Sequence, residues 1–445
     1  MLGHVDAVHG AYYLGLHFWI QVFGASPASV RLPSALASGV LVVGVSVLVR
    51  RLGTRRLAVV SSLVVAILPR VTSFGEEARS YAFGAMIAVW LLVLVVRLAE
   101  RPMAGMRWWM LYSMLLAAGI YTFLYVGLLI AVHAVVLLAA RVPRSTLARW
   151  AKATGVGIVL AAPVLVYGLA QHGQVSFLAA RDSVTPTSVL VSTWFGSVPL
   201  AVAGWVMIGV AAVFVAADLL RGRSFAARGA RPVSLTTLAL AWLLVPLGIL
   251  LLGNVAVADF SPRYLSSSAP AAGILVATGI VRLAGLLADS RRGSLVASML
   301  GLALVAGLAA PVFAAQRTPY AKNGTGWQSV SQVVGAHATP GDAVVFDEST
   351  GPSRRTRLAA LTYPDGFRGL NDVTLKTSFV DSDWWYSDAY PVEQALAKGR
   401  FDGVTRVWVV EDGGDDYGLA ELRAAGFTVA ESYSAHRSRI LELTR

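Results

Sequence analysis

Long apolar runs separated by short polar segments fill the first 314 residues of the chain. A helix that spans a membrane needs about 20 mostly apolar residues, and ten segments approach or exceed that length. The pattern therefore predicts a mainly α fold, a polytopic transmembrane helix bundle of about ten spans. The predicted spans are residues 32–49, 57–70, 80–98, 108–121, 124–140, 152–170, 196–219, 234–252, 264–287 and 294–314.

After residue 314 the pattern changes to short runs rich in β-branched residues and to short amphipathic segments. Such runs, bounded by Gly, Pro or Asp, are typical of buried strands. We therefore predict a transmembrane domain over residues 1–314 and a soluble α/β domain over residues 315–445. The predicted elements of the second domain are helices at 326–338 and 417–427 and strands at 343–347, 404–411, 428–434 and 438–443.

The composition agrees with this division. Charged residues make up only 14% of the chain, whereas ordinary soluble domains have about 25%. Residues 1–314 carry 23 Lys and Arg but 8 Asp and Glu, and residues 315–445 carry 14 and 17. No basic stripe interleaves with stacking aromatics, so no nucleic-acid partner is expected. The absence of Cys excludes disulfides, Cys-ligated zinc and thiol catalysis.

The basic residues of the membrane domain are concentrated in alternate loops. Short basic loops stay in the cytoplasm, so the loops between them face outward. This orientation predicts a multi-pass cell-membrane protein whose first 30 residues and C-terminal domain are extracytoplasmic. The basic loops are residues 50–56, 100–107, 141–152, 221–232 and 289–294, and the outward loops are 74–79, 171–188 and 253–264.

The amino terminus raises a separate question, because an outside start needs an export signal or a preceding span. The first ten residues, MLGHVDAVHG, provide neither. We therefore expect that an original first helix is missing from the sequence. The alternative is that so short a terminus is translocated unaided.

Ionisable side chains at the outward face are the candidates for chemistry, because charged groups near a bilayer are costly. A carboxylate beside an apolar wall is basic enough to take a proton from an alcohol, and arginine suits a phosphate. The alternative is that these are interfacial charges that pair and anchor helices. The candidates are Asp6 with His4, His9 and Tyr13; Glu76, Glu77, Arg79 and Tyr81; Asp182; and Asp259, Arg263 and Tyr264.

The order of these segments resembles a known class of enzymes. Asp6 is followed by Tyr12-Tyr13 and FGASPASVRLPSALA (23–37), and then by a basic loop, a span ending in Leu-Pro, GEEARSYAF (75–83), RYL (263–265) and the α/β tail. The order is similar to that of the GT-C class of polytopic glycosyltransferases, specifically the bacterial relatives of the protein O-mannosyltransferase and aminoarabinose transferase superfamily. The resemblance covers nearly the whole chain and is most specific in residues 4–37 and 75–83.

This resemblance implies roles for the candidate residues. It implies that Asp6 is the catalytic general base toward an acceptor hydroxyl, with inversion at the anomeric carbon of the sugar. It also implies a polyprenyl-phosphate sugar as the donor. Glu77, Arg79 and Tyr81 would bind substrate beside Asp6. Arg263 and Tyr264 match a late Arg-Tyr element, where we expect the donor phosphate.

One position departs from the family pattern. The usual acidic residue directly after the first-loop Asp is Ala7 here, so Glu76 or Glu77 is expected to supply the second carboxylate. His4 and His9 flank Asp6 at spacings that suit a divalent cation. The alternative is that these histidines are hydrogen-bonding partners, with His9 and Tyr13 lining the substrate site.

Three functional hypotheses follow. The first is a membrane glycosyltransferase that moves a sugar, most simply mannose, from a polyprenyl-phosphate carrier to an extracytoplasmic glycan, lipid or protein acceptor. The second is a polytopic transporter or lipid-linked sugar flippase, although the nearly uncharged midspan segments lack the polar, broken helices that transport sites use. The third is a membrane-anchored binding module, which leaves the outward-facing carboxylates unexplained.

Two further features have structural interpretations. His133 lies in the middle of a predicted span, where we expect an interhelical hydrogen bond. WWYSDAYP (384–391) is a candidate for sugar stacking, and packing within the C-terminal domain is the alternative that we favour.

Overall fold

The structure is a computed structural model, and it describes residues 6–101, 103–171, 173, 184–220, 233–257 and 260–445. The chain divides into two compact units, which meet in sequence at Ala314 and Ala315. The first unit, Asp6–Ala314, is helical, and the second, Ala315–Arg445, contains the sheet. Each unit is described by itself below.

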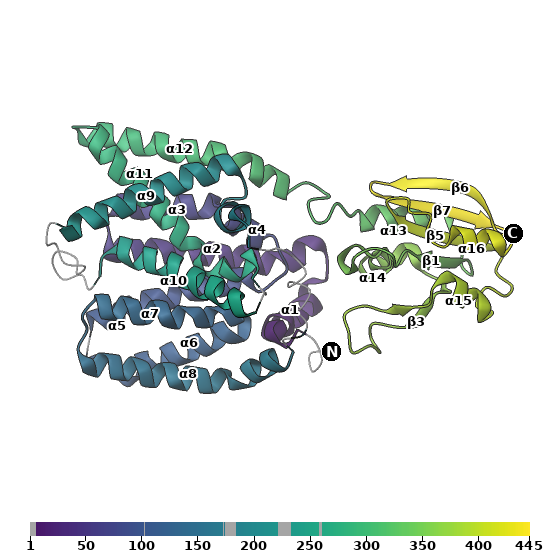
Figure 1. Ribbon diagram of the computed structural model, residues 1–445, viewed down its shortest axis with the longest axis horizontal. Helices are drawn as coiled ribbons and strands as arrows, with labels where there is room; N and C mark the ends of the chain where they lie inside the picture. Colours follow the sequence, from purple (N-terminus) through teal and green to yellow (C-terminus); the bar gives the residue numbers. More distant parts are fainter. Residues whose placement is uncertain (1–5, 102, 172, 174–183, 221–232, 258–259) are drawn as a thin grey trace. The chain divides into compact units, whose positions relative to one another are not determined.

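The transmembrane unit is a bundle of helices (Figure 1). Its α-helices are α1 (Gly10–Phe23), α2 (Pro27–Leu52), α3 (Arg55–Ile67), α4 (Pro69–Gly75), α5 (Tyr81–Glu100), α6 (Met106–Thr122), α7 (Leu129–Ala139), α8 (Arg144–Ala170), α9 (Val198–Leu220), α10 (Leu235–Ala256), α11 (Ala269–Leu287) and α12 (Arg291–Gln316). Short helical turns are η1 (Ala7–His9), η2 (Leu124–Leu128), η4 (Thr187–Ser192) and η5 (Pro262–Ser268).

The mainly α polytopic prediction is confirmed. Within the described residues, seven helices are long and apolar enough to cross a membrane, or eight if a bent pair counts as one span. The predicted span at 57–70 is that bent pair, α3 and α4, which meet at an angle of 59°. The predicted spans at 108–121 and 124–140 fall on shorter helices, α6 with 17 residues and the segment Leu124–Ala139. Ten hydrophobic segments therefore correspond to seven long helices and three shorter or bent ones.

Two helices, α5 and α11, form the centre of the transmembrane unit. Most of their side chains are buried, and α5 carries no charged residue between Tyr81 and Val96. Small residues allow α11 to lie close to α9, since a Cβ added to Gly279 would lie 2.1 Å from the carbonyl oxygen of Met207. By contrast, α12 exposes a row of large apolar side chains, as expected of a helix that faces lipid.

The segment before α2 differs from the prediction. Residues 1–30 were expected to form an outer loop, but η1 and the 14-residue α1 occupy most of the described part of it. Gly24, with φ +75°, ends α1, and the Ser26 hydroxyl caps α2 by accepting from the Ser29 N–H at 3.2 Å. This helix positions the residues that follow Asp6.

The C-terminal unit is a small α/β domain, as predicted. Its five-stranded sheet has the order β2-β1-β5-β7-β6, in which β1 is parallel to both neighbours and β7 is antiparallel to both. The strands are β1 (Ala343–Phe346), β2 (Asn371–Asp372), β5 (Arg406–Asp412), β6 (Thr428–Ala435) and β7 (Ser438–Thr444), and a separate pair is β3 (Leu375–Thr377) with β4 (Asp388–Ala389). The helices are α13 (Trp327–His337), α14 (Leu358–Thr362), α15 (Val392–Ala397) and α16 (Leu419–Ala424).

Successive side chains of the central strands β1 and β5 point to opposite faces of the sheet, and each face carries its own hydrophobic core. Val345 and Val409 belong to a cluster with residues of α15 and α16, whereas Val344 and Trp408 pack with residues of α13 and α14. The four longer strands and α13 and α16 agree with the predicted elements. The strands β2, β3 and β4, with two or three residues each, are too short to leave a periodic signal.

Candidate active site

The segment before α2 meets the start of α5 at one end of the bundle. Asp6 directly precedes η1, Tyr13 lies near the start of α1, and Arg79 lies in the loop before α5. The ring of His9 lies 6.3 Å from that of Tyr13 and 6.1 Å from that of Tyr81, between ring centroids. These five residues, which we call the Asp6 cluster, were all predicted site residues, and the structure brings them together.

Asp6 is buried, with 7% of its surface exposed, and it adopts the left-handed conformation (φ 56°) that aspartate tolerates. Its carboxylate accepts a hydrogen bond from the Tyr13 hydroxyl, and Oδ1 lies 3.9 Å from Nε2 of His9. Burial raises the pKa of this carboxyl to about 6, while the Tyr13 hydrogen bond and the charge of Arg79 lower it. At neutral pH Asp6 is therefore an anion with the basicity that a general base requires.

The backbone after Asp6 is tied to distant elements. The N–H of Ala7 donates to Oε1 of Gln171, which follows α8, at 2.9 Å. The N–H of His9 donates to the carbonyl of Asp6 at 3.0 Å. The first bond ties the segment to the end of α8 and the second closes the turn after Asp6, so the backbone that carries the carboxylate is held in place, as a catalytic group requires.

Arg79 is held by Tyr13 and interacts electrostatically with two carboxylates. Its Nη1 donates to the hydroxyl of Tyr13 at 3.1 Å, and its charge interacts with both Asp6 and Glu77. The backbone of this loop is held by the Ser34 hydroxyl, which donates to the carbonyl of Arg79 at 3.4 Å. The guanidinium of Arg79 therefore places a positive charge close to Asp6.

His9 is a neutral, packed side chain. Its Nδ1 is 2.8 Å from the hydroxyl oxygen of Ser80, and its ring stacks on Phe123 with centroids 6.4 Å apart. Burial, together with the charge of Arg79, lowers the pKa of His9 to about 4, so the imidazole is uncharged at neutral pH. This environment agrees with the hydrogen-bonding interpretation of His9.

The cation hypothesis gains no support from the described residues. Within them, no group of three or more His, Asp or Glu side chains is placed to hold a metal ion. His4 lies outside the described residues, as do Asp182 and Asp259. His9 and Asp6 by themselves supply one nitrogen and one carboxylate, which is fewer than a typical protein site for a divalent cation offers.

A run of aromatic rings joins the Asp6 cluster to the late Arg263-Tyr264 element. Centroid distances are 5.3 Å from Tyr81 to Phe123, 5.5 Å from Phe123 to Tyr125 and 4.0 Å from Tyr125 to Tyr264, where the rings stack. Tyr264 lies in η5, nearly 200 residues after Tyr81 in sequence. A continuous series of ring contacts therefore connects the Asp6 cluster with the Arg263-Tyr264 element.

Arg70 is a site residue that the sequence analysis missed. It lies in α4, where its Nε donates to the carbonyl of Thr193 at 2.7 Å and its Nη2 to that of Ser192 at 2.6 Å. Its charge interacts with those of Arg263 and Glu77. The sequence did contain a signal for Arg70. This arginine follows Leu68-Pro69 at the outward end of an apolar span, and few cations are found on that side because the basic loops face the cytoplasm.

Glu76 ends α4, and its N–H donates to the carbonyl of Ser73 at 3.2 Å. The structure places this half-buried residue one position before Glu77, in the loop that carries Arg79. Its backbone thus belongs to the turn that presents Glu77 and Arg79. The expected role of Glu76 in substrate binding stays a prediction.

An apolar cavity is lined by Tyr12, whose ring lies 5.8 Å from that of Tyr13 of the Asp6 cluster, between centroids. It has a volume of about 490 Å³ and lies between α1, α2 and α5. Tyr12, directly before Tyr13, lines it together with Trp19, Phe83 and Met86. A residue that lines the cavity, Tyr12, is therefore adjacent in sequence to Tyr13 of the Asp6 cluster. The cavity itself is suited to an apolar group.

Two features predicted to be structural can also be placed. His133 is buried, and its Nδ1 lies 2.9 Å from the hydroxyl oxygen of Tyr112, so the interhelical hydrogen bond is confirmed. In the 384–391 segment, the Tyr386 ring lies beneath Arg355, with the guanidinium carbon 5.5 Å from the ring centroid, while Trp384 is 48% exposed.

Comparisons with known proteins identify the fold. Residues 10–167 match the model of the dolichyl-phosphate-mannose-protein mannosyltransferase family. No curated protein matches the sequence. ArnT from Cupriavidus metallidurans in the apo state is 13% identical, with a TM-score of 0.58 over 99% of this chain and 88% of that one.

Two further structures agree with this result. ArnT from the same organism bound to undecaprenyl phosphate is 13% identical, with a TM-score of 0.56 over 97% of this chain and 87% of that one. The Archaeoglobus fulgidus oligosaccharyltransferase tethered with an acceptor peptide is 11% identical, with a TM-score of 0.51 over 98% of this chain and 66% of that one. The chain therefore has the polytopic fold of these membrane proteins, and the family model over residues 10–167 agrees with the GT-C resemblance.

Proposed function

We propose that the chain transfers a sugar, most simply mannose, from a polyprenyl-phosphate donor to an acceptor hydroxyl at the extracytoplasmic face of the membrane. The observation that carries this proposal is the Asp6 cluster: a buried carboxylate, hydrogen-bonded by Tyr13 and close to Arg79, beside an apolar cavity. A base, a cation for a phosphate and an apolar chamber are the three parts that such a transfer needs.

Asp6 acts as the general base. It takes the proton of the acceptor hydroxyl while that oxygen attacks the anomeric carbon of the sugar from the side opposite the phosphate. The new carbon–oxygen bond forms as the bond to the phosphate oxygen breaks, so the configuration inverts and polyprenyl phosphate leaves. The pKa of Asp6, about 6, suits this step because the group is ionised at neutral pH but remains a usable base.

Arginines stabilise the leaving phosphate. Arg70 and Arg263 interact with one another electrostatically, and two cations held near each other favour an anion between them. Arg70 is anchored by two backbone carbonyls, so its position is fixed before the substrate binds. Arg79, held by Tyr13, adds a third positive charge close to the proposed base.

The donor lipid occupies the cavity beside the cluster. Its walls are mostly apolar, and about 490 Å³ accommodates several isoprene units of a polyprenyl chain. Support comes from ArnT, a structural neighbour that was solved bound to undecaprenyl phosphate. A peptide acceptor in the oligosaccharyltransferase neighbour supports a macromolecular acceptor, which here is a glycan, a lipid or a protein.

The test is a donor panel assayed in membrane vesicles that contain the full-length protein. Polyprenyl-phosphate donors carrying radiolabelled mannose, glucose or arabinose are supplied, and label is followed from the lipid extract into the acceptor fraction. We expect transfer from one donor, most simply the mannose donor. Label that changes leaflet but remains on the lipid would instead identify a flippase, and transfer from another donor alone would reject mannose.

A further inference from the structure

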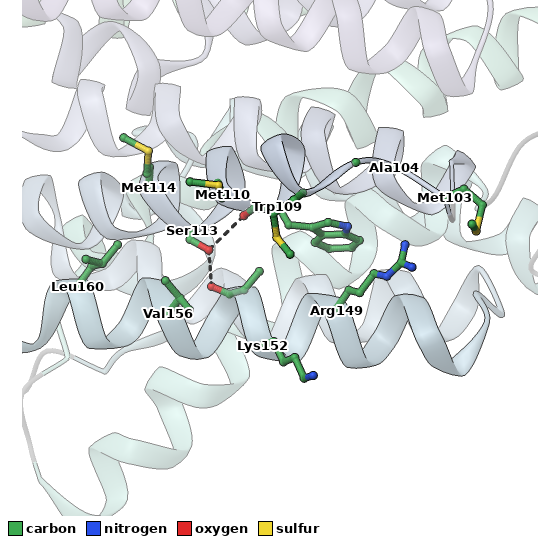
Figure 2. A pocket seen from close by; sticks show the side chains of 13 residues that line it. Met103, Ala104, Trp109, Met110, Ser113, Met114, Arg149, Lys152, Val156 and Leu160 are labelled. Atoms are coloured by element: carbon green, nitrogen blue, oxygen red, sulfur yellow. Dashed lines mark hydrogen bonds between the residues drawn. The ribbon is translucent and has the colours of Figure 1, made fainter.

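A second cavity opens between α6 and α8 (Figure 2). Its volume is about 600 Å³, and four of the eight methionines of the chain line it. Arg149 and Lys152 of α8 and Trp109 of α6 also line it. We call this cavity the Arg149 groove.

The Arg149 groove lies at the opposite end of the bundle from the Asp6 cluster. Phe123, whose ring stacks on His9, directly follows α6, whereas Met106 begins that helix. An α-helix rises 1.5 Å per residue, so the 17 residues of α6 separate its two ends by about 25 Å. A ligand in the groove is therefore remote from the proposed transfer chemistry.

The polar part of the groove is suited to an anion. Arg149 and Lys152 supply two cations, and Lys152 is the one lysine within residues 1–314. No carboxylate is found among the residues that line the cavity in the described part of the chain. Trp109 is 4% exposed, and its Nε1–H has no hydrogen-bond acceptor among the described residues. An indole N–H without an acceptor is costly when buried, and an anionic oxygen would satisfy it.

The base of the groove is rigid. The hydroxyl of Ser113 lies within hydrogen-bond distance of two backbone carbonyls, that of Trp109 at 3.1 Å and that of Ala153 at 2.8 Å (Figure 2). This bifurcated contact ties α6 to α8 directly beneath the cavity. The spacing between Trp109 and the cations of α8 is therefore set before any ligand binds.

The remaining walls are apolar and exposed. Met106, Met110 and Met114 recur every four residues on one face of α6 and are 73%, 57% and 63% exposed. Val156 and Leu160 continue the apolar surface on α8. In a membrane-spanning unit such side chains contact acyl chains, and methionine adapts its shape to flexible ligands.

We propose that the Arg149 groove binds an anionic glycerophospholipid. Its phosphate lies between Arg149 and Lys152 and accepts the Nε1–H of Trp109, and one acyl chain lies along the methionines of α6. A zwitterionic lipid fits less well, because its terminal ammonium would be repelled by these cations. A neighbouring cavity of about 450 Å³ shares Met103 and adds Arg97 and Arg101, which strengthens the preference for negative charge.

The test is lipid binding to the full-length protein, purified in a neutral detergent and stripped of lipid. Binding of phosphatidylglycerol and of phosphatidylcholine with the same acyl chains is titrated and counted by native mass spectrometry. We expect phosphatidylglycerol to bind about tenfold more tightly or better. Equal affinity for the two lipids would overturn the proposal.

Three variants examine the polar contacts. Replacing both cations, Arg149→Gln with Lys152→Gln, should weaken phosphatidylglycerol binding about 30-fold, since each cation near an anionic headgroup contributes about fivefold. Trp109→Phe keeps an aromatic ring, though a smaller one, but removes the indole N–H, and should weaken binding about tenfold. The exchange Arg149→Lys with Lys152→Arg keeps both charges and should restore binding; if it loses as much affinity as the double glutamine variant, the effect is one of packing and the proposal fails.

Matched controls lie elsewhere in the same unit. Arg291→Gln with Arg292→Gln removes two exposed cations at the start of α12, which Figure 1 shows on the opposite side of the bundle from α8. Trp205→Phe changes an indole of α9 whose N–H donates to the carbonyl of Leu190. Both variants should bind phosphatidylglycerol like the wild type. Inorganic phosphate or glycerophosphate binding as tightly as the lipid would show an anion site without lipid recognition and would overturn the assignment.

Discussion

The Asp6 cluster and the Arg149 groove use the same kinds of side chain at opposite ends of the bundle. Each sets arginine beside aromatic rings and an apolar cavity of several hundred Å³. They differ in their carboxylates, because Asp6 is buried at the centre of the first, whereas the described residues lining the second include no Asp or Glu. Both are suited to a lipid phosphate, but one contains a base.

The two sites also differ in how deeply their cations are buried. Arg79 and Arg70 are half-buried, and they donate to Tyr13 and to two backbone carbonyls, whereas Arg149 and Lys152 are exposed side chains on α8. Partly buried cations held in place stabilise charge that develops during a reaction, while exposed cations are sufficient to attract a headgroup. The Asp6 cluster is therefore suited to catalysis and the Arg149 groove to binding. Each prediction below tests one of these two roles.

The largest expected effect comes from removing the base. Asp6→Asn keeps the size of the side chain but cannot accept a proton, so kcat for sugar transfer should fall about 1,000-fold. Initial rates in vesicles with saturating donor measure this effect. The donor should still bind, because the arginines remain.

Two controls belong with this variant. Asp289→Asn changes an exposed carboxylate between α11 and α12 and should leave the rate unchanged. The double glutamine variant of Arg149 and Lys152 should also transfer sugar like the wild type when donor is saturating. If Asp6→Asn retains wild-type kcat, Asp6 is not the base.

The next effect concerns donor affinity. Arg263→Ala removes one cation from the proposed phosphate site, so the apparent KM for the donor should rise about 30-fold, as expected for losing a charged hydrogen bond. Donor titrations would show this with a smaller change in kcat. Arg282→Ala, which changes a guanidinium 5.3 Å from the ring of Phe214, is the matched control. An unchanged donor KM in Arg263→Ala would remove this residue from the phosphate site.

Hydrophobic periodicity predicted most of the fold. Within the described residues, the ten apolar segments fall on the seven long apolar helices, the bent pair, α6 and the segment Leu124–Ala139, and alternation located the four longer strands of the C-terminal sheet. The bend between α3 and α4 was not anticipated, although Pro69 lies at it and proline interrupts helix hydrogen bonding. α1 was missed because its 14 residues are shorter than a span and follow a polar terminus.

The candidate site was predicted in part. Asp6 and Arg79 could be singled out because charges at a membrane boundary are rare, whereas Tyr81 was assigned only through the family resemblance. Their proximity could not be derived, since it depends on contacts between residues about 70 positions apart, such as His9 with Ser80. Arg70 was missed because its position at the outward end of a span does not by itself indicate a role, and only the folded structure shows that its charge interacts with that of Arg263.

A pH profile of transfer should distinguish the two sites. Because burial raises the pKa of Asp6 to about 6, protonation below that pH removes the base, and the rate should be about tenfold lower at pH 5 than on the plateau. His9, with a pKa of about 4, stays neutral over this range. Lipid binding in the Arg149 groove should not change from pH 5 to 8, because its lining includes no carboxylate or imidazole in the described residues. A flat rate profile between pH 5 and 8 would contradict the assignment of Asp6.

The smallest predicted effect isolates the hydrogen bond between Tyr13 and Asp6. This bond favours the ionised carboxylate and so lowers its pKa against the larger effect of burial. Tyr13→Phe removes the hydroxyl, so the acidic limb of the rate profile should move to higher pH while the rate at pH 8 changes little. Tyr12→Phe, which alters the neighbouring ring in the apolar cavity, should keep the midpoint of that limb. A midpoint that moves to lower pH in Tyr13→Phe would mean that the hydroxyl stabilises the protonated acid instead, and Tyr13 would then hold Asp6 ready to donate a proton and not to accept one.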